Sequence, residues 1–141
     1  MGNLKPDIRI FDQLDALSLA AAELFIETSA QAIGQRGRFV AALSGGNTPT
    51  ELFKLLAQTP YRERIDWQRL HAFWGDERCV PVGDLENNYR QAHEVLLGRV
   101  PIPLENIHRV RSELEPGAAA EDYARHSRTS QPLRSIGRAS I

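Results

Sequence analysis

The sequence predicts a three-layer α/β fold built on a mostly parallel sheet. Short apolar segments that end in glycine-containing turns alternate with longer segments whose apolar residues recur every three or four positions. The run at 38–43 is typical of a strand buried on both faces, as strands of parallel sheets are. Alternating strands and helices indicate one layered domain, and 141 residues suffice for one such core.

The first elements are a strand and a long helix. Residues 7–11 alternate polar and apolar side chains, which predicts a short strand, and Asp12 follows as a plausible N-cap. The helix then runs to about Gln35 and stops at Gly37. Its predicted buried stripe consists of Leu14, Leu17, Ala21, Leu24, Phe25, Thr28 and Ala32.

The later elements alternate regularly along the chain. Periodicity and turn residues predict strands at 38–43, 70–74 and 107–110, and helices at 48–58, 88–97 and 116–126. Serines and arginines then follow without a period. We therefore expect residues 1–126 to form part of one domain and residues 127–141 to be a disordered or non-native tail, with a surface helix that docks elsewhere as the alternative.

Composition excludes several classes of protein. The net charge of −1 predicts no broad attraction to nucleic acid or to an anionic membrane. Cys79 is the only cysteine, so an intrachain disulfide and multi-cysteine zinc sites are excluded, and we expect its side chain to be small and buried. No apolar run approaches the roughly 20 residues that span a bilayer, and residues 1–11 lack a secretory signal, so we expect a cytoplasmic protein.

The run at 44–49, Ser-Gly-Gly-Asn-Thr-Pro, is a candidate anion site. Its glycines let the backbone approach a ligand, and Thr48 with Glu51 is predicted to form a capping box where the next helix begins. Unpaired amides and the helix dipole favour an anion there, and the hydroxyls of Ser44 and Thr48 could add hydrogen bonds. The alternative is a tight, well-capped turn without a ligand. The run matches neither a Walker A loop nor a dinucleotide fingerprint, so a simple sugar phosphate fits better than a nucleotide.

A second polar turn follows the strand expected at 70–74, on the same edge of the sheet. Arg78 offers a planar cation for a phosphate or carboxylate, and Asp76 can orient a hydroxyl or a water, or transfer a proton. The alternative is a solvated turn in which Asp76 or Glu77 pairs with Arg78.

The helix expected at 88–97 begins with Asn87 or Asn88 as its N-cap. Arg90 in the first turn opposes the helix dipole, which hints at an external anion nearby, a solvated arginine being the alternative. We expect His71 to be packed or hydrogen-bonded within its strand rather than catalytic, and His126, where the predicted tail starts, to have no fixed position.

Three motifs in order carry a family resemblance: Ser-Gly-Gly-Asn-Thr-Pro at 44–49, Gly-Asp-Glu-Arg-Cys-Val-Pro at 75–81 and Asn-Asn-Tyr-Arg at 87–90. Over about residues 5 to 125 the chain resembles the 6-phosphogluconolactonase family, whose fold is similar to those of glucosamine-6-phosphate deaminases and ribose-5-phosphate isomerases. The resemblance implies hydrolysis of 6-phospho-D-glucono-1,5-lactone in the oxidative pentose phosphate pathway, without a metal or organic cofactor, by a monomer.

Carried over residue by residue, the resemblance implies two sets of site residues. Asp76 and Arg78 are the expected catalytic polar groups. The expected substrate-binding residues are Ser44, Gly45, Gly46, Asn47, Thr48, Arg78, Asn88 and Arg90. Which of the two turns takes the phosphate and which takes the lactone stays open.

One feature of the family is missing. Its members continue into a second half with a G-x-D-G-H-x-A-S-type segment, whose histidine is thought to be the general base, and this sequence contains no such segment. We therefore expect a truncated, frame-shifted or fragmentary chain with an incomplete sheet, marginal stability and little activity. The alternatives are a deaminase or isomerase of the same fold and a sugar-phosphate-binding chain without turnover.

Overall fold

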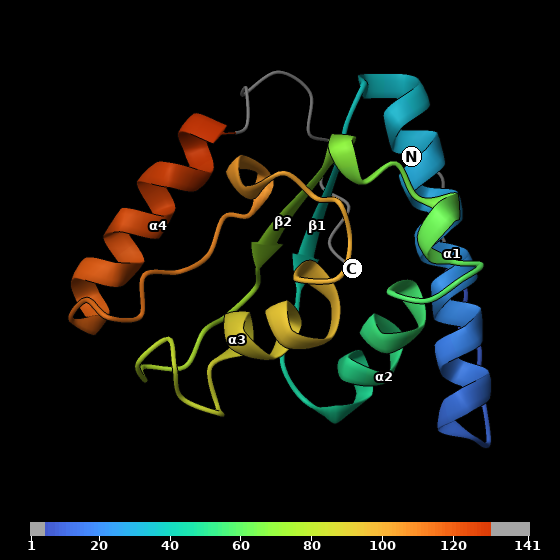
Figure 1. The fold of residues 1–141 in the computed structure, drawn as a ribbon, viewed down its shortest axis with the longest axis horizontal. Helices are drawn as coiled ribbons and strands as arrows, with labels where there is room; N and C mark the ends of the chain where they lie inside the picture. The colour runs from blue at the N-terminus through green and yellow to red at the C-terminus, as the bar shows by residue number, and fades with distance from the viewer. Residues whose placement is uncertain (1–4, 131–141) are drawn as a thin grey trace.

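The computed structural model describes residues 5–130, which form three layers (Figure 1). A parallel pair of strands lies in the middle, with helices α1 and α2 on one side and α4 on the other. This arrangement confirms the predicted α/β class and the parallel sheet. Within residues 5–130, no helix is both long enough and apolar enough to cross a membrane.

The sheet consists of β1 (Phe39–Leu43) and β2 (Leu70–Trp74), which pair in parallel from Phe39 opposite Leu70 to Leu43 opposite Trp74. The strand expected at 107–110 is reduced to a single bridge between Ile107 and Ala72. The strand expected at 7–11 was wrong, because no described residue pairs with this segment and its Ile8 and Ile10 are largely exposed.

Helix α1 (Leu14–Arg36) packs on α2 and β1. Its predicted stop is confirmed, since Gly37 adopts a left-handed φ of 76° and donates its amide to Ile33. Its N-cap is Gln13 rather than Asp12. The predicted stripe was largely wrong, because the helix carries apolar residues around most of its circumference and contacts with α2 and β1 select the buried face. Small side chains dominate that face, which consists of Ser18, Ala22, Ile26, Ser29 and Ala32, whereas Leu14, Leu17 and Leu24 are exposed.

The connections between the strands contain the remaining helices. Helix α2 (Asn47–Leu56) follows β1, and two short 3-10 turns, η1 (Arg62–Arg64) and η2 (Trp67–Arg69), lead into β2. After β2, α3 (Asn88–Ala92) continues directly into a π-helical turn, η3 (His93–Leu97), so the helix predicted at 88–97 is confirmed in extent. The 3-10 turn η4 (Leu104–Asn106) precedes the bridge residue Ile107.

Helix α4 (Pro116–Ser130) begins at the predicted proline and runs beyond the predicted end at 126. Residues 127–130 are therefore helical rather than disordered, in line with the alternative of a surface helix, and the rest of the predicted tail, 131–141, lies outside the described residues. Tyr123 fixes α4 to the sheet, because its hydroxyl accepts from the Trp74 amide at 2.8 Å and donates to the Trp74 carbonyl at 2.9 Å.

The two faces of the sheet differ in their cover. Phe39, Ala41 and Leu43 of β1 face the helices and are buried. Val40 and Ala42 point to the opposite face and are exposed, so the prediction that this strand is buried on both faces was wrong. On β2 the opposite face is covered, since Phe73 stacks on the His108 ring with 4.3 Å between centroids.

Candidate active site

The two predicted polar turns lie side by side, where β1 and β2 end at the same edge of the sheet. Leu43 and Trp74 are register partners, and the amide of Gly75 donates to the Leu43 carbonyl at 3.2 Å. The Ser44–Pro49 run and the loop at 75–79 therefore leave neighbouring strands at their carboxyl ends, the edge where open α/β sheets bind ligands.

The first turn exposes a helix start. Gly46, with a left-handed φ of 107°, is the N-cap of α2, and Asn47 and Thr48 occupy the first helical positions. The predicted capping box was wrong, because the N-cap is Gly46, two residues before Thr48, and Glu51 pairs with Lys54 instead. Among residues 5–130, no acceptor bonds the amides of Asn47 and Thr48. These two donors, together with the exposed Ser44, form a potential anion site.

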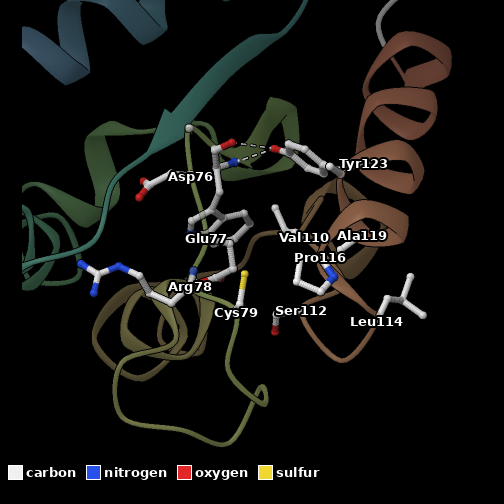
Figure 2. Close-up of a pocket in the computed structure, with 13 residues that line it drawn as sticks. Asp76, Glu77, Arg78, Cys79, Val110, Ser112, Leu114, Pro116, Ala119 and Tyr123 are labelled. Atoms are coloured by element: carbon white, nitrogen blue, oxygen red, sulfur yellow. Dashed lines mark hydrogen bonds between the residues drawn. The ribbon is translucent and has the colours of Figure 1, made fainter.

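The second turn presents Asp76 and Arg78, which are both exposed. Figure 2 shows their side chains leaving the loop on the same side, away from Tyr123 and α4. Within the described residues the Arg78 guanidinium forms no ion pair, and only the Arg78 backbone amide bonds Glu77, so the alternative of a side-chain pair with Asp76 or Glu77 was wrong. A cation and a carboxylate are thus both exposed next to the end of β1.

Glu77, between these two residues, points elsewhere. Its Oε1 accepts from the amide of Asn88 at 2.7 Å, and its Oε2 accepts from the amide of Tyr89 at 3.0 Å. A carboxylate at this end of α3 is favoured by the helix dipole. Asn87 is the N-cap, as one of the two predicted candidates, and its Oδ1 accepts from the Arg90 amide at 2.9 Å.

Asn88 contacts both turns. It is 2% exposed, and its Nδ2 donates to the Asp76 carbonyl at 3.1 Å. The same side chain lies against Gly45, where a Cβ atom would overlap the Asn88 amide group. Any side chain at position 45 would therefore displace Asn88, although of the two glycines in this turn Gly46 alone has a positive φ.

Arg90 lies in a network of its own. Its Nε donates to Glu94 Oε1 at 2.8 Å, and its Nη1 donates to the carbonyl of Gly83. The basic residue in the first turn thus has an acidic partner one turn later, which accounts for its position without an external anion. One turn after Asn88, Gln91 Oε1 accepts from the Gly46 amide at 3.3 Å.

A cavity of about 220 Å³ lies on the other side of the loop, between residues 74–79 and the start of α4 (Figure 2). Much of its wall is apolar, from Val110, Leu114, Pro116 and Ala119. Cys79 lines it and is exposed, so the prediction of a buried thiol was wrong, because the loop leaves the sheet before this residue.

Three imidazoles form a row between β2 and α4. His108 Nε2 lies 3.1 Å from His71 Nδ1, and His108 Nδ1 lies 2.7 Å from His126 Nε2. The hydrogen-bonded role predicted for His71 is confirmed, whereas His126 has a fixed position in α4, contrary to the prediction. Burial lowers the pKa of His108 to about 4, with His126, His71 and Arg38 adding to the effect, so this ring is neutral near pH 7.

Sequence reasoning missed two residues of this region, Glu77 and Gln91. The sequence suggests Glu77 only as a partner for Arg78. A helix start with no acidic residue of its own, such as the one at Asn88, is a signal that a carboxylate from elsewhere supplies the charge. Nothing in the sequence signals the bond between Gln91 and Gly46, which depends on how α3 meets α2.

The chain is similar to proteins of known family. The family model described as glucosamine-6-phosphate isomerases/6-phosphogluconolactonase matches residues 12–138. The chain belongs to this family. A curated 6-phosphogluconolactonase of Haemophilus influenzae is 53% identical over 75 residues, which are 53% of this chain and 32% of the relative. One of Nostoc is 35% identical over 127 residues, 89% of this chain and 51% of the relative. The chain thus spans about a third to a half of these relatives.

Solved structures in the family agree with the fold. A structure described as devB protein superposes with a TM-score of 0.79 at 41% identity, over 90% of this chain and 52% of that one. The 6-phosphogluconolactonase of Thermotoga maritima gives 0.74 at 30% identity, over 81% and 50%. A monomeric glucosamine-6-phosphate deaminase gives 0.73 at 15% identity, which shows a common fold alone.

Proposed function

We propose that this chain carries the substrate-binding part of a 6-phosphogluconolactonase, which hydrolyses 6-phospho-D-glucono-1,5-lactone to 6-phospho-D-gluconate. The observation that carries the proposal is the pairing of the two turns. The exposed amides of Asn47 and Thr48 can hold one anionic or carbonyl group of the substrate, and Arg78 a second, because both lie at the joined ends of β1 and β2. Asp76, exposed beside Arg78, can orient a hydroxyl or water or transfer a proton.

The names of the relatives support the lactonase over the other reactions of the family, since the Haemophilus and Nostoc proteins are both 6-phosphogluconolactonases. The proposal includes the roles predicted above for Ser44, Gly45 and Gly46. Asn88 and Arg90 have a weaker case as substrate-binding residues, because their side chains are engaged with the Asp76 carbonyl and with Glu94. We also propose a cytoplasmic monomer from the sequence and the resemblance, although rice relatives are named chloroplastic.

Binding of the reaction product tests this proposal. Titration of the chain with 6-phosphogluconate, followed by NMR, is expected to shift the amide resonances of Asn47 and Thr48. Replacing Arg78 by Gln is expected to weaken binding by about tenfold or more, because a hydrogen bond between charged groups is lost. Arg62→Gln, on the exposed turn η1 that precedes β2, is the matched control and should bind like the unmodified chain.

Two further measurements test the reaction and the activity of this chain. Tighter binding of glucosamine 6-phosphate than of 6-phosphogluconate would contradict the lactonase assignment and favour the deaminase alternative. Hydrolysis of the lactone by the purified 141-residue chain is expected to be slow or undetectable, and a normal lactonase turnover would overturn that part of the proposal.

A further inference from the structure

Glu77 is flanked by the two exposed residues of the second turn, but it is itself half-buried. Its side chain reaches the start of α3, eleven residues along the chain. Oε1 accepts from the amide of Arg78 at 2.8 Å and from the amide of Asn88 at 2.7 Å, while Oε2 accepts from the amide of Tyr89 at 3.0 Å. One carboxylate therefore holds amides from both ends of the intervening segment.

We infer that Glu77 is a positioning residue of the candidate active site, which fixes Asp76 and Arg78 relative to the Ser44–Pro49 turn. This inference rests on the proposed function. Both Glu77 oxygens accept from backbone amides, so the carboxylate is directed into the protein rather than away from it like Asp76 and Arg78. Hydrogen bonds to an ionised acceptor are stronger than neutral ones, which suits a fixed connection.

The connection extends to the first turn through Asn88. The amide of Asn88 bonds Glu77, while its side chain bonds the Asp76 carbonyl and packs against Gly45. One turn further, Gln91 accepts from the amide of Gly46. The start of α3 thus touches both polar turns, and the Glu77 carboxylate determines how the second turn sits on it.

Capping of α3 alone does not explain Glu77. Asn87 already caps this helix, because its Oδ1 accepts from the Arg90 amide, and its Nδ2 donates to Ser112 at 3.1 Å. Asn87 is 1% exposed at the helix start, and within the described residues its side chain forms no hydrogen bond with residues 75–79. Asn87→Ala is therefore a matched control that weakens the same helix end and leaves the Glu77 connection in place.

The test compares Glu77→Gln, Glu77→Ala and Asn87→Ala in the full 141-residue chain. Hydrogen exchange of the Arg78 amide, followed by NMR, reports the placement of the loop, and calorimetry with 6-phosphogluconate reports the site. Glutamine keeps one acceptor oxygen, so its effect should be smaller than that of alanine. It should still differ from glutamate, because its NH₂ group would face a backbone N–H. We expect the Glu77 variants to exchange faster at Arg78 and to bind 6-phosphogluconate about tenfold more weakly.

Asn87→Ala should lower the melting temperature but should neither speed exchange at Arg78 nor weaken the binding of 6-phosphogluconate. Equal losses of affinity in the Asn87 and Glu77 variants would overturn the inference, as would a protected Arg78 amide or an unchanged affinity in Glu77→Gln. If alanine at position 77 prevents folding, the glutamine variant decides alone. If the unmodified chain does not bind 6-phosphogluconate, the proposed function fails for this chain, and exchange at Arg78 still supports or overturns the positioning role.

Discussion

Strands β1 and β2 have the same length and pair in register, yet their surroundings differ. Every second residue of β1 is exposed, whereas four of the five residues of β2 are buried. The outer edge of β2 is occupied by the Ile107 bridge and the Tyr123 hydroxyl, while β1 pairs within residues 5–130 with β2 alone. Within the described residues, the outer edge of β2 is therefore covered, whereas the outer edge of β1 has no partner strand.

The difference between the strands should be largest in their contribution to stability. Leu70→Ala on β2 is expected to lower the free energy of unfolding by about 2–5 kcal/mol, because Leu70 is 2% exposed and its loss leaves a cavity. Val40→Ala on β1 should cost less than about 1 kcal/mol, because Val40 is 36% exposed. Urea unfolding of both variants measures the contrast, and equal losses would contradict it.

Acidification should destabilise the β2 side. The unfolded chain binds a proton at His108 near the ordinary pKa of about 6.5, and the folded chain does so only near 4. The neutral His108 ring thus contributes about 3 kcal/mol to the free energy of unfolding above about pH 6.5, and this contribution is lost as the pH falls toward 4. Unfolding of His108→Gln over the same range is the control, since other titrating groups are common to both proteins. Parallel profiles would refute this account.

The smallest of the three effects concerns the outer edge of β2. Tyr123→Phe removes the hydroxyl that bonds both the amide and the carbonyl of Trp74, and should cost about 1–3 kcal/mol. Hydrogen exchange at the Trp74 amide should accelerate as well. Tyr61→Phe, on a ring that packs against the core beside η1, serves as the control, and an unaltered Trp74 amide would argue against the role of Tyr123.

Much of the fold could be predicted from the sequence because local signals agreed with tertiary structure. Apolar runs marked β1 and β2, Gly37 marked the end of α1, and the pair Asn87 and Asn88 marked the start of α3. The errors concern features that depend on contacts with other elements. The buried face of α1 is chosen by α2 and β1, and the segment at 7–11 has strand periodicity but no strand partner among the described residues.

The candidate site was predicted in its composition and less well in its connections. Both turns could be predicted to meet, because parallel strands end at one edge. The start of α2 was misplaced, since Gly46 rather than Thr48 caps the helix, which moves the exposed amides to Asn47 and Thr48. The bonds of Glu77 to Asn88 and Tyr89 span eleven and twelve residues, and no local pattern encodes such a distance.

The contact between Gly45 and Asn88 has a consequence for how this sequence can vary. The Gly45 backbone lies against the side-chain amide of Asn88, so a methyl group at position 45 would displace that side chain unless position 88 carried a smaller residue. A smaller residue there would also release the Asp76 carbonyl from its bond to Asn88. The two positions, 43 residues apart, are therefore expected to change together or not at all in sequences that keep this arrangement.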